Sequence, residues 1–211
     1  MRLMKGKLIT IEGVEGVGKS TNINFISSYM ESKNIKYLCA REPGGTVNAE
    51  KIRDILLHSE EEKVPEIAEL LLFFSARSFH IENVIIPALI NGINVICDRF
   101  ADATIAYQGN GRGFDIKQIN QISKWVQNDL KPNLTILLDA PAEVGMKRTK
   151  IREKNDRMES EKISFYERVR QGYLNIARND PERVVIVDAT KDILSVEKNI
   201  EKHLNHLFSE K

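Results

Sequence analysis

Residues 9–30 read ITIEGVEGVGKSTNINFISSYM, and this stretch decides the fold. Its first residues, ITIE, are typical of a strand, and its last part, STNINFISSYM, predicts a helix. Between them, residues 13–20 (GVEGVGKS) match the pattern G-x-x-x-x-G-K-[ST]. A strand that turns through glycines directly into a helix gathers backbone N–H groups around a phosphate.

The residue types of this loop suit a triphosphate. Glycines at 13, 16 and 18 let the backbone bend so that several N–H groups point at one cluster of phosphate oxygens. Lys19 adds a full charge at the β/γ bridge, and Ser20 offers a hydroxyl to Mg²⁺. The alternative is a glycine-rich turn without a ligand. The predicted triphosphate-binding residues of the loop are Gly13, Val14, Glu15, Gly16, Val17, Gly18, Lys19, Ser20 and Thr21.

Outside the loop, short apolar runs alternate with longer segments of helical period. Strands rich in Ile, Val and Leu, separated by helices, indicate a parallel sheet buried on both faces. The expected strands are 7–12, 36–40, 93–97, 134–139 and 184–187. The expected helices are 19–33, 48–58, 65–91, 115–128, 142–153, 161–179 and 194–208, and Pro87 should kink or split the third of them. We predict an α/β fold with a five-stranded parallel sheet flanked by helices, and ligands at the carboxyl ends of the strands.

The composition excludes several classes of protein. The 31 basic and 30 acidic residues leave a net charge of +1, which gives no drive toward nucleic acid or an anionic membrane. The longest apolar runs are too short for a membrane span. Cys39 and Cys97 lack the spacing of a zinc site or a redox pair and suit a reducing compartment. We therefore expect a cytoplasmic protein of one domain, residues 1–211, with a small mobile appendage.

A carboxylate follows the third expected strand. INVIC ends in Asp98-Arg99-Phe100, so Asp98 lies at the carboxyl end of a strand, where it can hold a water on Mg²⁺. A GTPase would show Asp-x-x-Gly here and a later Asn-Lys-x-Asp, and the sequence has neither. Arg99, beside the acid, is a cation available to a second anion. The simpler interpretation of Asp98 is a cap at the end of a strand.

Residues 147–157, KRTKIREKNDR, concentrate positive charge in a chain that is otherwise neutral. Six basic residues face two acidic ones, a local excess of four. Such a run is ordinarily the solvated face of a helix. Beside a triphosphate loop it also predicts a lid, at about residues 147–158, that brings arginines to the phosphates.

The order and spacing of the motifs resemble bacterial thymidylate kinases, in the nucleoside monophosphate kinase branch of the P-loop NTPases. The resemblance runs from ITIEGVEGVGKST through REPGGT, EKIR, LLLFFSAR, IIPAL, CDRF, AYQGNGRG and PNLTILLDAPAEVGMKR to the last helix. It implies transfer of the γ-phosphoryl group of ATP to dTMP with Mg²⁺, by a homodimer. A kinase for another monophosphate, such as dUMP or dGMP, and a regulatory ATP-binding module are the alternatives.

The resemblance also implies a dTMP site. Phe73 and Arg77 lie four apart on one helix face, where the family stacks and hydrogen-bonds thymine; by itself Phe73 in LLLFF suggests a core residue. Arg77 needs a buried anion or carbonyl as a partner. In the family the acid of the loop contacts the sugar 3′-hydroxyl and the arginines the monophosphate. The implied dTMP-binding residues are Glu15, Arg53, Phe73, Arg77, Arg99, Thr104, Tyr107 and Gln108.

Catalysis is expected from Lys19, Asp98 and an arginine of the lid. The family carries its catalytic arginine either in the phosphate loop or in the lid, and position 16 here is glycine. Matching the lid to the bacterial pattern favours Arg152, with Arg148 nearer the adenine or phosphates of ATP. Ser20 and, through water, Asp98 are the expected Mg²⁺ contacts. Phe100 stands where the family commonly has tyrosine, which removes a hydroxyl.

Overall fold

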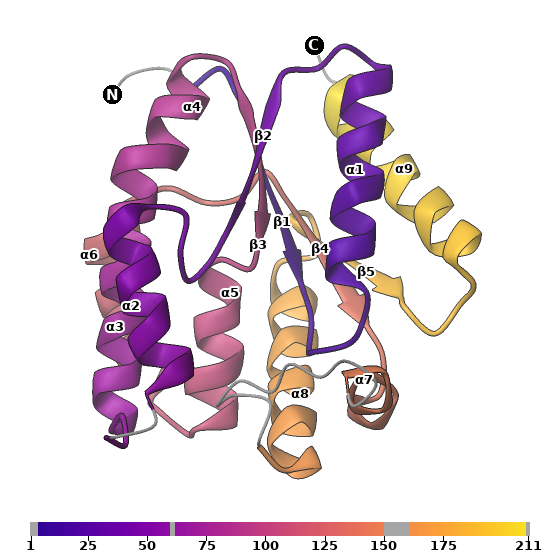
Figure 1. The fold of residues 1–211 in the computed structure, drawn as a ribbon. Helices are drawn as coiled ribbons and strands as arrows, with labels where there is room; N and C mark the ends of the chain where they lie inside the picture. The colour runs from indigo at the N-terminus through magenta and orange to yellow at the C-terminus, as the bar shows by residue number, and fades with distance from the viewer. Residues whose placement is uncertain (1–3, 60–61, 150–160, 210–211) are drawn as a thin grey trace.

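The computed structural model describes residues 4–59, 62–149 and 161–209. Within them, five parallel strands form one sheet in the order β2-β3-β1-β4-β5 (Figure 1). The strands are β1 Leu8–Glu12, β2 Tyr37–Arg41, β3 Asn94–Asp98, β4 Leu134–Asp139 and β5 Val184–Asp188. The central strand, β1, pairs with β3 and β4, so the loop that follows it opens at the middle of the carboxyl edge. The predicted fold class and five-stranded parallel sheet are confirmed.

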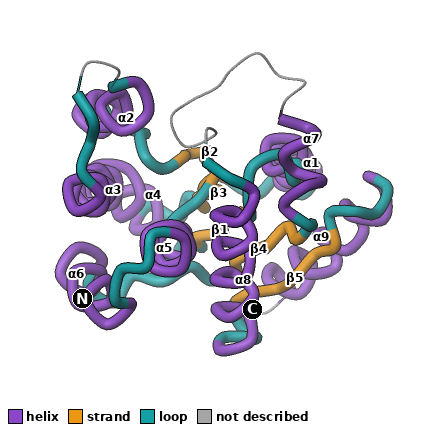
Figure 2. Tube along the Cα trace, turned by 90° about the horizontal axis from the view of Figure 1, so that it is seen from below, coloured by secondary structure: helices purple, strands orange, loops and turns teal. Residues whose placement is uncertain are grey.

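Helices cover both faces of this sheet. They are α1 Lys19–Ser32, α2 Val47–His58, α3 Glu66–His80, η1 Ile81–Ile85, α4 Ile86–Ile90, α5 Ala101–Thr104, η2 Ile105–Gly111, α6 Ile116–Gln127, α7 Ala142–Thr149, α8 Ile163–Asn179 and α9 Ile193–Ser209. Figure 2 shows α1 and α8 on opposite sides of the strands. Along β1, Ile9 and Ile11 share a core cluster with Met30 of α1, and Leu8 shares another with Ile85 of η1. No helix among the described residues is long and apolar enough to cross a bilayer.

The helical segment expected at 65–91 is divided, as its proline predicts. α3 ends at His80, a π-helical turn (η1) follows, and α4 continues to Ile90. Pro87 has no N–H to donate and its ring crowds the carbonyl four residues earlier, so a regular α-helix cannot pass through it. The wider turn just before the proline accommodates this break.

Residues 101–111 are helical, which the sequence did not predict. α5 gives way to seven residues of π-helix, η2, that include Gly109 and Gly111. Glycine normally weakens a helix. At Gly111, however, a Cβ would lie 2.7 Å from the ring of Phe165 in α8, so the absence of a side chain lets η2 and α8 pack closely. Tertiary packing therefore decides this helix, and a short apolar pattern with two glycines does not reveal it.

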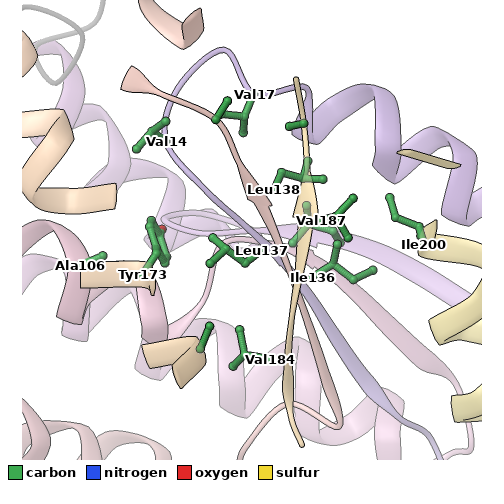
Figure 3. Packing of buried hydrophobic residues seen from close by; sticks show 14 of the residues in the cluster. Val14, Val17, Ala106, Ile136, Leu137, Leu138, Tyr173, Val184, Val187 and Ile200 are labelled. Carbon is green, nitrogen blue, oxygen red and sulfur yellow. The ribbon is translucent and has the colours of Figure 1, made fainter. Parts of the chain in front are cut away.

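The phosphate loop rests on the hydrophobic core. Val14 and Val17 are buried and belong to the same cluster as Leu137 and Leu138 of β4 and Tyr173 of α8 (Figure 3). A loop fixed in this way by buried side chains holds its backbone in place before any ligand arrives.

Candidate active site

The loop between β1 and α1 has the left-handed backbone that glycine permits. Gly13, Gly16 and Gly18 have φ angles of 135°, 72° and 96°. Gly18 directly precedes α1, so the amino end of that helix opens at the loop. The free N–H groups and positive dipole end at such a position can hold an anion.

Position 16 is also limited by a neighbouring helix. A Cβ on Gly16 would lie 2.1 Å from the carbonyl oxygen of Gly145 in α7, and a Cβ on Gly145 would lie 2.2 Å from the carbonyl oxygen of Glu15. Neither approach is possible for real atoms without movement of the backbone. The main chain of α7 is thus seated on the phosphate loop, which leaves no room for a side chain at position 16.

Lys19 folds back over its own loop. Its Nζ donates to the carbonyl oxygens of Gly13 at 3.2 Å and Val14 at 2.9 Å. Burial and, after it, the nearby charge of Arg99 lower the pKa of Lys19 to about 8, although Asp98 opposes this shift. Because burial disfavours the charged form of Lys19, an anionic ligand beside it stabilises that form strongly.

Asp98 and Ser20 suit a magnesium ion carried by a nucleotide. Asp98 ends β3 in register with Ile11, two residues before the loop, and its buried Oδ1 has no partner among the described residues. Ser20 is exposed in the first turn of α1. No group of three or more His, Cys, Asp or Glu in the described part of the chain forms a metal cluster. Mg²⁺ typically takes one or two protein ligands and completes its shell with waters and phosphates, so these residues fit it.

A pocket, called here the arginine pocket, opens beside the loop. Its volume is about 560 Å³ including the open mouth. It brings together all eight residues implied as dTMP contacts, from four separate stretches of the chain. Its walls are Glu15, Glu42, Pro43, Arg53, Leu57, Phe73, Arg77, Arg99, Phe100, Ala103, Thr104, Tyr107 and Gln108.

Arg99 is held against the phosphate loop. Its backbone has a φ of 66°, unusual for a residue other than glycine. The guanidinium donates to the Gly13 carbonyl at 3.0 Å, to the Tyr173 hydroxyl at 3.1 Å and to Glu15 Oε1 at 2.8 Å. It also lies 4.8 Å from the centre of the Tyr107 ring, and the Tyr107 hydroxyl donates to Glu15 at 2.7 Å. Arg99 therefore presents fixed positive charge at the edge of the arginine pocket.

Arg77 is almost fully buried, and two of its nitrogens each donate to a different acceptor. Nε donates to Glu42 Oε2 at 2.7 Å, and Nη2 donates to the Phe100 carbonyl at 2.9 Å. Nη1 is buried and has no partner within the described residues. The buried anion that Arg77 was expected to need is thus Glu42, and one N–H edge is left over. Phe73, one turn earlier, is half-buried, so it packs on the core and still lines the pocket.

Gln108 and Thr104 form the deep wall of the arginine pocket, and both are about 1% exposed. Gln108 Nε2 donates to Glu69 Oε1 at 2.9 Å, and Glu69 is also contacted by Arg112. Arg53 of α2 is half-buried on the opposite wall and donates to the Pro43 carbonyl at 2.9 Å. Polar groups therefore surround the apolar faces of Phe73 and Leu57 in this pocket.

Glu12 is a buried carboxylate directly before the loop. It accepts from the Phe100 N–H and from the Tyr173 hydroxyl, both at 2.7 Å. Burial raises the pKa of Glu12 to about 7, helped by Asp102, while Arg99 opposes the rise. Through Tyr173, this carboxylate ties β1 and β3 to α8 at the base of the site.

A second cavity, the loop pocket, lies on the other side of the phosphate loop. It is lined by Gly16, Val17, Gly18, Thr21, Asn22, Arg148, Ala189, Lys191, Ile193 and Val196. Arg148 of α7 is close to the Ala189 carbonyl, with Nη1 at 3.4 Å. Arg152, Arg157 and most of the expected lid fall in residues 150–160, outside the described residues.

Sequence reasoning missed the residues that hold the pocket residues in place. They are Glu12, Glu42, Glu69, Arg112 and Tyr173. The one available signal was an acid inside an apolar run, as in ITIE and EIAELLLFF. Such an acid needs a buried partner. Gln108, one partner of Glu69, lies 39 residues away, so periodicity alone cannot identify it.

A central β1, a glycine-rich loop into a helix and two pockets meeting at that loop define a P-loop NTPase of the kinase type. Residues 11–200 match the family model for thymidylate kinase. The chain is 45% identical over 204 residues to a thymidylate kinase of Marinomonas sp. strain MWYL1, covering 97% of this chain and 96% of the relative. It is 46% identical over 204 residues to that of Methylococcus capsulatus, with 97% of each covered.

A solved structure agrees with these relatives. The crystal structure of thymidylate kinase from Ehrlichia chaffeensis superposes with a TM-score of 0.76 at 33% identity, covering 95% of this chain and 98% of the other. The chain therefore belongs to the thymidylate kinase family. Neither alternative, a kinase for another monophosphate or a regulatory ATP-binding module, finds support in these relatives.

Proposed function

We propose that the chain transfers the γ-phosphoryl group of ATP to dTMP, giving ADP and dTDP, with one nucleotide in each pocket. The observation that carries this proposal is the position of two adjacent residues: Glu15 lines the arginine pocket and Gly16 lines the loop pocket. Two nucleotides bound on either side of the loop therefore meet head to head at the loop.

ATP takes the loop pocket. The amides of residues 13–18 and the start of α1 hold its phosphates, and Lys19 turns from the carbonyls of its own loop to the phosphate chain. Thr21 and Arg148 flank the nucleotide, as both line this pocket. An added polyanion stabilises the charged form of Lys19 and so raises its pKa from about 8.

dTMP takes the arginine pocket. Arg53 and Arg99 bind its phosphate, for which a guanidinium fork is well suited. Glu15 accepts from the sugar 3′-hydroxyl, and Tyr107 occupies the space that a 2′-hydroxyl would need. Phe73 stacks on the base ring, and Arg77 donates to the base through Nη1, which is unpaired among the described residues. Thr104 and Gln108 contact the edge of the base.

Mg²⁺ bound with ATP neutralises charge on the phosphates during transfer. We assign Ser20 as its direct protein ligand and Asp98 as the residue that orients one of its waters, because Asp98 Oδ1 is buried without a partner in the described residues. A measurement of activity against Mg²⁺ concentration tests this assignment: replacing Ser20 with alanine should raise the concentration required.

The reaction needs no side chain to remove a proton. A phosphate oxygen of dTMP is already ionised and attacks the γ-phosphorus, while the bond from that phosphorus to the β-bridging oxygen breaks. The work of the protein is to position the groups and to stabilise charge on the transferring phosphoryl. We assign that stabilisation to Lys19 and Arg152, and the water-mediated positioning of Mg²⁺ to Asp98.

The test is ADP release with a panel of monophosphates. ADP should form with dTMP at the highest kcat/KM, and with dUMP and dGMP much more slowly. Calorimetry should find separate sites for ATP and dTMP, and replacing Phe73 with alanine should weaken only the second. ATP binding without a dTMP site, or release of ADP independent of any acceptor, contradicts the proposal.

We also propose that the chain forms one domain in the cytoplasm. Two copies of it associate through α2 and α3. Ile67 and Leu71, one turn apart on α3, are 54% and 49% exposed, and Ile55 of α2 is 48% exposed. Such apolar area on neighbouring helices favours burial against a second copy. Two free cysteines suit a reducing compartment. Light scattering on the purified chain should give twice the monomer mass, and aspartate at Leu71 should halve it.

A further inference from the structure

We propose that Glu69 is a positioning residue for base selection: it fixes the orientation of the Gln108 amide, so that a carbonyl oxygen rather than an amino group faces the base. The inference rests on the proposed function, which places a pyrimidine in the arginine pocket beside Gln108. Glu69 itself is fully buried on α3, behind the wall that Gln108 forms.

The contact between the two side chains determines the orientation of the amide. Glu69 Oε1 and the terminal nitrogen of Gln108 are 2.9 Å apart, and both side chains are almost completely buried. A carboxylate only accepts hydrogen bonds, and of the two ends of an amide only the nitrogen donates. The reverse orientation would face oxygen to oxygen without water to separate them, so it is excluded on energetic grounds.

Arg112 supplies the opposite charge that a buried carboxylate requires. Its Nε and Nη2 lie 3.3 Å from the two oxygens of Glu69. Arg112 is itself fixed, because it also pairs with Glu161 and lies 4.9 Å from the centre of the Phe165 ring. Glu69 is thereby held in place as the acceptor that the Gln108 amide faces.

The amide therefore presents its oxygen, which has no partner among the described residues, as an acceptor at the pocket wall. Arg77, which also lines the pocket, keeps its buried donor Nη1 without a partner among the described residues, because Glu42 and the Phe100 carbonyl occupy its other nitrogens. This acceptor and donor complement the N3–H and O4 of thymine or uracil. Cytosine has an acceptor at N3 and an amino group at C4, so both contacts would be repulsive.

The substitution Glu69→Gln tests the inference because it keeps size and shape but offers either end of an amide to Gln108. The Gln108 amide can then turn and present its amino group to cytosine N3. The ratio of kcat/KM for dTMP to that for dCMP should fall by about 30-fold or more, through slower dTMP turnover and equal or faster dCMP turnover. Glu66→Gln, an exposed carboxylate on the same helix, is the matched control and should keep the wild-type ratio.

A purely structural role gives a different result. It would lower kcat/KM for both monophosphates by the same factor, and an unchanged ratio in folded Glu69→Gln overturns the inference. If that variant does not fold, Glu69→Asp keeps the charge beside Arg112 while lengthening the contact to Gln108, and the ratio should fall several-fold; a wild-type ratio there overturns it equally. Wild-type activity on dTMP in the same assay separates failure of this inference from failure of the proposed function.

Discussion

At the scale of single residues, the ammonium group of Lys19 has an unusually low pKa. Its pKa of about 8 in the free protein reflects burial and the neighbouring Arg99, with carboxylates opposing both. The charged form therefore prevails at pH 7 but is lost as the pH rises through about 8. Lys19 makes two hydrogen bonds to loop carbonyls, and in the proposed complex the triphosphate replaces them.

We expect kcat/KM for ATP to fall above about pH 8, by up to tenfold per pH unit, because this parameter reports the free enzyme. At saturating ATP, kcat should stay level over the same range, because the bound phosphates raise the pKa of Lys19. Initial rates from about pH 6.5 to about pH 9.5, at low and at saturating ATP, check both statements. A level kcat/KM across that range would show that Lys19 keeps its proton without ATP.

Some single residues of the site can be predicted from the sequence, and others cannot. Lys19, Ser20 and Asp98 follow from a local pattern, and the eight residues of the arginine pocket follow from motifs of the family. The buried partners do not. Glu42 bonds a residue 35 positions away and Tyr173 bonds Glu12 from 161 positions away, so only the folded chain defines these contacts.

At the scale of elements, α7 is the feature that sequence could not place. A helix was expected at 142–153, and α7 occupies 142–149 of the described residues, but its contact with the phosphate loop depends on two glycines that meet backbone to backbone. The strands were easier to predict, because a strand buried on both faces reads as a continuous apolar run. The helix at 101–111 was missed since its support comes from α8 rather than from its own propensity.

We expect Gly145→Ala to lower kcat/KM for ATP by about tenfold or more, because the added methyl displaces α7 and with it Arg148. Helix propensity acts in the opposite direction, since alanine in place of a helical glycine adds about 1 kcal/mol of stability where space allows. Kinetics combined with thermal unfolding separate the two effects. Glu143→Ala, at an exposed position of the same helix, should leave kcat/KM unchanged; equal effects in both variants would refute the role of the contact.

At the scale of the whole molecule, the arginine pocket and the loop pocket meet at the phosphate loop. Arg148 is placed at the loop pocket by α7, whereas Arg152 lies outside the described residues. We propose different tasks for the two arginines: Arg148 holds ATP, and Arg152 stabilises the transferring phosphoryl group.

We expect Arg152→Ala to reduce kcat by about 10³-fold with little change in KM for ATP, because an arginine that acts in the transition state contributes mainly to rate. Arg148→Ala should instead raise KM for ATP. Steady-state kinetics of both variants with dTMP at saturation decide between them. A large loss of kcat at Arg148 with near-normal turnover at Arg152 would exchange the assignments.

The touching main chains of Gly16 and Gly145 also limit how this enzyme can be redesigned. Placing an arginine at position 16 of the loop is not a single substitution in this scaffold, because the first turn of α7 already fills the space. The phosphate loop and α7 have to be exchanged together, because an arginine in this loop alone would displace α7 from it.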